Sequence, residues 1–137
     1  GTPRWPHRLT TDKGFELAEF PLSTFKLPGY TLPIAGGGYF RLFPYWFSRY
    51  GLGSINRHGR PFVFYLHPWE VDPDQPRLDV KWFSRFRHYN NLDVCEQRLA
   101  RLLSDFRFTT MSQVLESEGV LEPSSNTLAS SSVAGMA

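Results

Sequence analysis

Cysteine is almost absent from this chain of 137 residues, because Cys95 is the only one. A single cysteine excludes an internal disulfide framework and a zinc site built from several thiolates. No apolar run approaches the roughly 18 residues that a membrane span requires, so we expect no membrane-spanning helix. The spacings His-x-x-x-His and Cys-x-x-Cys are also missing, so we predict no metal site within this chain.

An excess of charge of one sign is missing as well. The formal net charge is +2, from 15 Lys and Arg against 13 Asp and Glu. The cations are spread along the sequence rather than clustered, so we predict no nucleic-acid partner. What is present is a hydrophobic share of 41% and an aromatic share of 16%, which predicts one globular domain with a core. The chain begins with glycine rather than methionine, and we expect it to be a processed product or a fragment.

The segment 62–67, Phe-Val-Phe-Tyr-Leu-His, is the most informative part of the sequence. A short apolar run rich in aromatic and β-branched residues is typical of a fully buried strand. Pro68 cannot donate to a sheet, so the strand should end at His67. In α/β folds, functional residues lie at the carboxyl ends of strands, and His67 occupies such an end.

Periodicity and breaker residues predict the other elements. We expect a short strand over 15–20, a loop or hairpin over 22–35, a helix over 40–55, an irregular segment over 70–87, a strand over 106–110 and a last helical turn or two over 112–118. A further helix should begin at Asn90 or Asn91 as N-cap. Its predicted buried stripe consists of Leu92, Cys95, Leu99, Leu102 and Leu103.

The predicted boundary of the folded domain lies after Met111. Residues 1–111 form the domain, and residues 112–137 form a largely disordered tail. The serine-rich and alanine-rich sequence from Glu122 onward cannot bury a core, which is the reason for this expectation.

His67, Trp69 and Glu70 are the candidate functional side chains beside this strand end. His67 either caps the strand by a backbone hydrogen bond or acts as a general acid or base, and its position favours the second interpretation. Trp69 either fills the core or forms a platform for the apolar face of a sugar, and spacing alone does not separate the two. For Glu70 we favour a structural acceptor at the start of the loop over a partner for His67.

Two other features have a structural and a functional interpretation. Gly36, Gly37 and Gly38 fit no phosphate-loop spacing, so backbone freedom or close approach beside a groove is favoured over phosphate binding. The mixture of cations and aromatics over 85–91 is interpreted as a loop that anchors the last helix rather than as a nucleic-acid surface. His88 within it ranks below His67 as a substrate contact. Cys95 is expected to be a small buried hydrophobe.

Four blocks of sequence, in order, resemble one family. They are Glu-Phe-Pro-Leu-Ser-Thr (19–24), Pro-Ile-Ala-Gly-Gly-Gly-Tyr-Phe-Arg-Leu (33–42), Phe-Tyr-Leu-His-Pro-Trp-Glu-Val-Asp-Pro-Asp-Gln-Pro-Arg (64–77) and Arg-Phe-Arg-His-Tyr-Asn-Asn-Leu (85–92). Together they resemble the C-terminal half of bacterial polysaccharide deacetylases of carbohydrate esterase family 4, in the subgroup found with exosortase and exopolysaccharide gene clusters. The resemblance extends from about Arg4 to Met111.

This resemblance implies an α/β fold, the C-terminal part of a distorted (β/α) barrel, and a hydrolase that removes acetyl groups from amino sugars of a polysaccharide. In the family a metal-bound water attacks the acetyl carbonyl, an aspartate is the base, and a late histidine protonates the leaving amine. The late motif Leu-x-His corresponds to Tyr65-Leu66-His67, so His67 inherits the general-acid role. Tyr65, which stands where the family generally has leucine, and Trp69 would bind substrate.

The family's early motifs, which carry the metal ligands and the base, have no counterpart in this sequence. We therefore expect no cofactor in this chain, a divalent metal such as zinc in a complete family member, and no turnover by the chain alone. Its expected partners are the polysaccharide and the remaining N-terminal half of the deacetylase domain. The alternative is a non-catalytic carbohydrate-binding or assembly module derived from the same fold.

Overall fold

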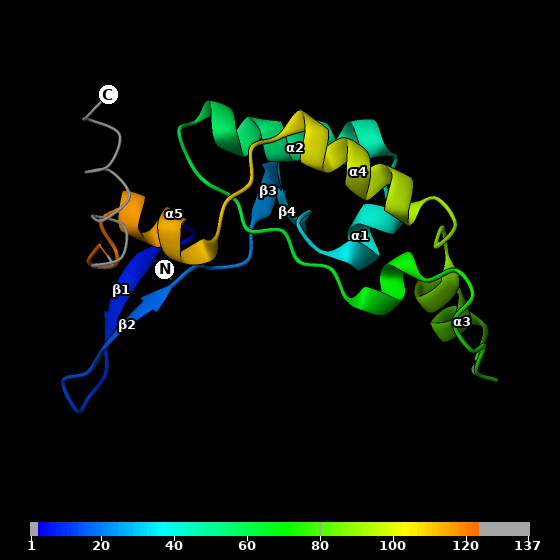
Figure 1. The fold of residues 1–137 in the computed structure, drawn as a ribbon, viewed down its shortest axis with the longest axis horizontal. Helices are drawn as coiled ribbons and strands as arrows, with labels where there is room; N and C mark the ends of the chain where they lie inside the picture. The colour runs from blue at the N-terminus through cyan, green and yellow to red at the C-terminus, as the bar shows by residue number, and fades with distance from the viewer. Residues whose placement is uncertain (1–2, 80, 124–137) are drawn as a thin grey trace, which may run out of the picture. The chain divides into compact units, whose positions relative to one another are not determined.

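The computed structural model describes residues 3–79 and 81–123, which divide into two compact units (Figure 1). One unit comprises residues 6–20 and 109–123, and the other comprises residues 3–5 and 21–108. In the described part of the chain, no helix has the length and apolarity needed to cross a bilayer.

The first unit contains an antiparallel hairpin and a short helix. Strand β1 (His7–Thr10) pairs with β2 (Glu16–Glu19), which confirms the strand predicted over 15–20. Helix α5 (Met111–Ser117) confirms the helical turns predicted over 112–118. Thr110 is its N-cap, and the Thr110 hydroxyl accepts a hydrogen bond from the Gln113 amide at 3.3 Å. The part of the predicted disordered tail beyond Pro123 lies outside the described residues.

The second unit begins with another antiparallel hairpin. Strands β3 (Thr24–Leu27) and β4 (Tyr30–Pro33) pair in register across the turn at Pro28 and Gly29. Gly29 has a φ of +77°, a left-handed conformation that glycine adopts without steric cost. Of the two predicted alternatives for residues 22–35, the hairpin is therefore the correct one.

The single helix predicted over 40–55 is two helices. Helix α1 (Gly37–Leu42) ends before Phe43, and helix α2 (Tyr45–Arg57) starts after Pro44. Proline disfavours the helical conformation of the preceding residue, and Phe43 accordingly has an extended ψ of 151°. Pro44 thus separates two helices instead of occupying the first turn of one.

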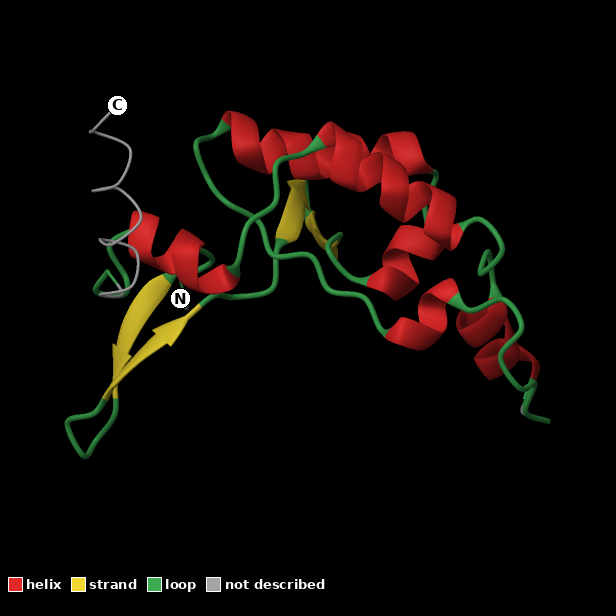
Figure 2. Ribbon diagram, viewed as in Figure 1, coloured by secondary structure: helices red, strands yellow, loops and turns green. Residues whose placement is uncertain are grey.

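The core of the second unit lies among the β3–β4 hairpin, α1, α2 and helix α4 (Cys95–Asp105). Figure 2 shows α4 alongside α2, and strand β3 contacts α2. The buried core residues are Phe25, Ile34, Ala35, Phe40, Leu52, Ile55, Cys95 and Leu102. Burial raises the pKa of the Cys95 thiol, so this residue is the small buried hydrophobe that the sequence predicts.

The buried strand predicted over 62–67 is wrong in its pairing and its burial. Its pairing among the described residues is a single parallel bridge between Tyr65 and Gly36, and Tyr65 and His67 are exposed. The Tyr65 amide donates to Ala35 O at 2.9 Å, and the Gly37 amide donates to Tyr65 O at 3.1 Å. The apolar composition predicted a strand, but a strand also needs neighbours along its length.

Several boundaries further along the chain also differ from the prediction. The strand predicted over 106–110 is absent, whereas the 3₁₀ helix η1 (Pro68–Val71) and helix α3 (Trp82–Tyr89) lie within the segment predicted to be irregular. Helix α4 has Val94 at its N-cap, because Asn91 adopts a left-handed φ of 54° and cannot start a helix. The mixed α/β class is confirmed, but the described sheets are two antiparallel hairpins and show no barrel.

A polar contact connects α2 to α4 beside the core. The Tyr45 hydroxyl donates to Asp105 Oδ2 at 2.7 Å, and Arg49 Nε donates to the same oxygen at 2.8 Å. The guanidinium of Arg101 lies over the Tyr45 ring at 5.1 Å. Burial and the hydrogen bond to Asp105 raise the pKa of Tyr45 to about 12, and the same hydrogen bond lowers the pKa of Asp105.

We predict that Tyr45→Phe lowers the free energy of unfolding at neutral pH, and that the difference from the wild type disappears at alkaline pH. Tyr45 holds its proton more tightly in the folded than in the unfolded chain. Its contribution is therefore complete below the ordinary pKa of 10.0 and is lost as the pH rises toward about 12. Urea unfolding at a series of pH values measures this, and a difference that stays constant from pH 10 to 12 would contradict it.

Two adjacent leucines of α4 test where the core lies. Leu102 is fully buried, whereas Leu103, which the sequence predicted to be buried, is 55% exposed. We expect Leu102→Ala to lower the free energy of unfolding by about 2–5 kcal/mol, because it leaves a cavity. Leu103→Ala is the control and should change it by about 0.5 kcal/mol or less. Equal losses in denaturant unfolding would show that the stripe is assigned incorrectly.

Candidate functional site

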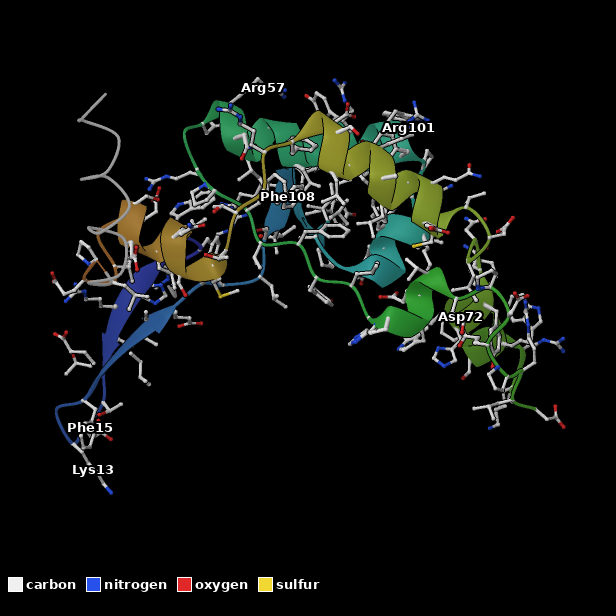
Figure 3. The ribbon with its side chains drawn as sticks, viewed as in Figure 1. Lys13, Phe15, Arg57, Asp72, Arg101 and Phe108 are labelled. Carbon is white, nitrogen blue, oxygen red and sulfur yellow. The ribbon has the colours of Figure 1, made fainter. Side chains whose placement is uncertain are left out.

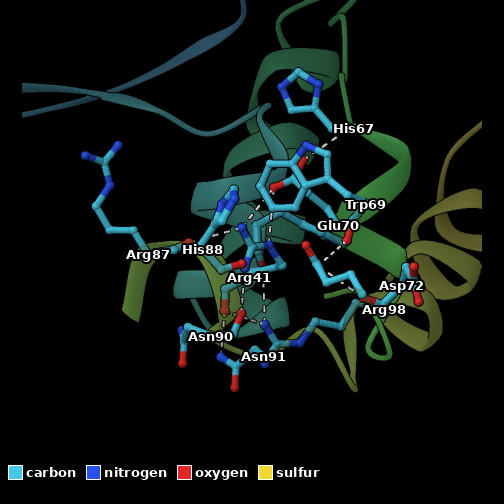
Figure 4. Close-up of polar contacts among 12 residues, drawn as sticks. Arg41, His67, Trp69, Glu70, Asp72, Arg87, His88, Asn90, Asn91 and Arg98 are labelled. Carbon is cyan, nitrogen blue, oxygen red and sulfur yellow. Dashed lines mark hydrogen bonds and ion pairs between the residues drawn. The ribbon is translucent and has the colours of Figure 1, made fainter. Parts of the chain in front are cut away.

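A groove of about 860 Å³ opens in the second unit, and it brings together the three predicted site residues Tyr65, His67 and Trp69. The side chains used below are Tyr65, His67, Trp69 and His88 on its wall, with Arg41 and Glu70 at its base. Figure 4 labels all of them except Tyr65. They come from α1, the extended segment 62–67, η1 and α3, which are far apart in the sequence.

The wall of the groove is a continuous row of rings. The imidazole of His67 stacks on Trp69 with a centroid separation of 5.7 Å and an interplanar angle of 8°. Tyr65 contacts His67 edge-on at 6.2 Å, and His88 tilts against Trp69 at 4.4 Å. His67 is exposed and Trp69 is partly buried, so both stacked rings reach solvent.

Local sequence chemistry places His67 at this position. The extended segment brings the chain to His67, and Pro68 then starts η1 because proline suits the first turn of a helix. Glu70 Oε2 accepts from the His67 amide at 3.0 Å, and the Glu70 amide donates to His67 O at 2.9 Å. Glu70 is therefore the structural acceptor that the sequence favoured, and it fixes the backbone that carries His67.

Arg41 forms a buried ion pair with Glu70 beneath the row of rings. Arg41 Nη2 and Glu70 Oε1 are 3.1 Å apart, and each side chain is only 2% exposed. Arg41 Nε donates to the same carboxylate oxygen, and its remaining N–H groups donate to the carbonyl oxygens of Arg87, His88 and Asn90 at 2.8–3.2 Å. All five donors of the guanidinium are thus used, which a buried charge requires.

The same arginine also links the base to the wall and to α4. Its guanidinium lies over the Trp69 ring at 5.4 Å, a cation–π contact that supports the indole from below. The Arg41 carbonyl accepts from Asn91 Nδ2 at 2.7 Å and from Arg98 Nη1 at 3.0 Å. Arg98 donates to Phe40 O as well, so a side chain of α4 satisfies the last carbonyls of α1.

Close approach explains two of the three glycines. A β-carbon at Gly37 would collide with the Glu70 carboxylate, and one at Gly36 would collide with the Tyr65 phenol. The predicted close approach beside a groove is therefore confirmed for these two positions. Gly38 lines the groove and has open space around it.

Sequence reasoning missed Arg41 and interpreted the segment 85–91 only as a loop that anchors the last helix. That segment includes most of α3 rather than being a loop, and its carbonyl oxygens hold Arg41. The available signal for Arg41 was an arginine inside the aromatic run 39–43, because a cation among apolar residues is rarely buried without a partner.

No group of three or more His, Cys, Asp or Glu side chains that could hold a metal ion is found within residues 3–79 and 81–123. The groove offers an imidazole, the side chain most often used for proton transfer, beside a flat aromatic surface. This combination can protonate a leaving group while its substrate rests on Trp69.

Comparison with known proteins gives one family. The family model described as Domain of unknown function (DUF3473) matches residues 1–116. No curated protein and no solved structure matches the chain.

Replacing Glu70 by glutamine tests the base of the groove, because it leaves the Arg41 charge buried without a counter-charge. We expect the free energy of unfolding to fall by about 3–5 kcal/mol. Glu16→Gln is the matched control, since Glu16 pairs with Arg8 at 3.2 Å in an exposed ion pair worth about 0–1 kcal/mol. If denaturant unfolding gives similar losses for both variants, the buried pair does not hold the groove together.

Proposed function

Since the chain belongs to the family described as Domain of unknown function (DUF3473), we propose its function from the chemistry of its groove. It is the C-terminal part of a polysaccharide deacetylase, a hydrolase that removes N-acetyl groups from amino sugars of a bacterial exopolysaccharide. The resemblance of four sequence blocks to carbohydrate esterase family 4 motivates this assignment.

The observation that carries the proposal is the exposed imidazole of His67 stacked on Trp69 in a groove of about 860 Å³. Loss of an acetyl group from an amino sugar requires a proton for the departing amine nitrogen. Histidine is suited to deliver it because its ordinary pKa lies near neutrality. His67 is the general acid, and the hydrogen bonds between its backbone and Glu70 hold it in place.

The surroundings of His67 suit a sugar. Trp69 offers the flat surface on which the apolar face of a pyranose ring rests, and Tyr65 lies next to the imidazole, where the acetyl group would be held. The groove volume falls within the range of about 300–1,000 Å³ that is usual for ligand sites. Tyr65 is bulkier than the leucine of the family, so it narrows the acetyl position.

One observation supports the proposal that the catalytic unit is completed by an N-terminal half. The extended segment 62–67 has main-chain groups along which further strands could pair, since one bridge at Tyr65 uses only part of them. The resemblance to carbohydrate esterase family 4 assigns the metal and the base of the proposed enzyme to that half, which together with this chain would form the (β/α) barrel.

The second candidate is a non-catalytic carbohydrate-binding module. The row of rings favours it, because stacking on Trp69 binds a sugar without any chemistry at His67. Under this alternative Trp69→Ala abolishes binding of the polysaccharide, and no variant at His67 affects acetate release.

The test is His67→Ala in the complete protein, with acetate release from an N-acetylglucosamine oligomer as the measurement. We expect kcat to fall by about a hundredfold to ten-thousandfold, the range that general acid catalysis supplies. The Kd for the oligomer should change little, because Trp69 still supplies the binding surface. The chain alone should release no acetate.

His58→Ala is the matched control, since His58 lies at the end of α2 and its Nδ1 donates locally, to Ser54 O at 2.7 Å. It should leave kcat unchanged. Full turnover by the His67→Ala variant, or by the chain alone, would refute the assignment of His67 as general acid in an incomplete site.

A further inference from the structure

A second groove of about 620 Å³ lies between α2 and α4, and its lining shares no residue with the first groove. The side chains used below are Trp46, Arg49, Tyr50 and Arg57 of α2 and Arg101 and Asp105 of α4. All of them belong to the second unit.

Helical periodicity arranges the α2 side chains as two parallel rows. Arg49 and Arg57 follow the i, i+4 spacing through Gly53, and Trp46 and Tyr50 form the neighbouring row. At about 1.5 Å per residue, the two arginines are about 12 Å apart along the helix axis. A cationic row thus runs beside an aromatic row over the length of an extended ligand.

Two of the arginines lie over aromatic rings. The guanidinium of Arg57 lies over Tyr50 at 5.5 Å, and that of Arg101 lies over Tyr45 at 5.1 Å. An arginine can make such a contact and still bind a carboxylate through its N–H groups, with two hydrogen bonds. Figure 3 labels Arg57 and Arg101 on the two helices.

Packing between α2 and α4 does not account for Trp46 and Tyr50. The connection between the helices uses Tyr45, Arg49 and Asp105, whereas Trp46 is 68% exposed and Tyr50 is 55% exposed. Exposed aromatic rings on a helix face, rimmed by arginine, are enriched at binding surfaces rather than on an ordinary solvated face.

We propose that this second groove binds a carboxylate-bearing polysaccharide chain, with Trp46 under a sugar ring and Arg57 and Arg101 on the carboxylates. The proposal rests on the proposed function in one respect, namely that the ligand of this protein is a polysaccharide. The second groove would hold the polymer, while the first groove contacts the amino sugar that loses its acetyl group.

Charge selects this ligand over the other occupants. Three guanidiniums and one carboxylate, that of Asp105, lie among the residues that line this groove, so a neutral glycan would leave cations unmatched. A nucleic acid would need a wider basic face than these three arginines, and the net charge of the whole chain is only +2. A second copy of the chain would present the same cations and repel them.

The experiment measures binding of an oligogalacturonate and of a neutral N-acetylglucosamine oligomer of equal length to the 137-residue chain by isothermal titration calorimetry. The oligogalacturonate should bind more tightly, and its affinity should fall as salt is added. Arg57→Gln and Trp46→Ala should each weaken it by about tenfold or more. Arg85→Gln and Trp82→Ala, two exposed positions on α3 that line neither groove, are the matched controls and should leave it unchanged.

Trp69→Ala separates this proposal from the proposed function. Oligogalacturonate binding that survives Trp69→Ala but not Trp46→Ala supports the second groove, whatever becomes of deacetylation. The reverse pattern would place the acidic glycan in the first groove and overturn the proposal. So would equal affinity for the neutral oligomer, tighter binding of single-stranded DNA of equal charge, or a dimer in sedimentation that Trp46→Ala dissociates while no glycan binds.

Discussion

The ion pair between Arg41 and Glu70 is the contact on which the groove depends. Both side chains are buried, and burying two charges is tolerated only when their hydrogen bonds are satisfied. Glu70 meets this condition through Arg41 and the His67 amide, and Arg41 meets it through Glu70 and three carbonyl oxygens near the end of α3. One carboxylate therefore sets the position of the candidate acid, while its partner sets the position of α3.

The glycine pair and the row of rings follow from that ion pair. Gly37 has no side chain because the Glu70 carboxylate occupies the space, and Gly36 leaves room for Tyr65. The guanidinium below Trp69 supports the ring on which His67 stacks. The exposed, reactive surface of the groove is thus carried by a buried electrostatic base, and rigid support of this kind is what a proton-transferring group requires.

The sequence predicted what depends on local chemistry. Pro28 and Gly29 left a loop or a hairpin as the alternatives, of which the β3–β4 hairpin is correct, and the glycine run indicated backbone freedom or close approach. It could not predict contacts between distant segments: Arg41 and Glu70 are 29 positions apart, and nothing local shows that they meet. The prediction of a buried strand over 62–67 failed for the same reason, because apolar composition does not say whether neighbouring strands are present. Helix α3 was missed because its aromatic side chains face outward.

The central claim is that the wall formed by His67 and Trp69 holds an N-acetylated sugar with its amide nitrogen next to the imidazole. A structure of the complete protein with a bound N-acetylglucosamine oligomer measures this directly. The account predicts a sugar ring on Trp69 and an amide nitrogen at about 3 Å from a ring nitrogen of His67, the usual hydrogen-bond distance. An oligomer bound away from this groove, or one whose amide faces away from His67, would contradict it.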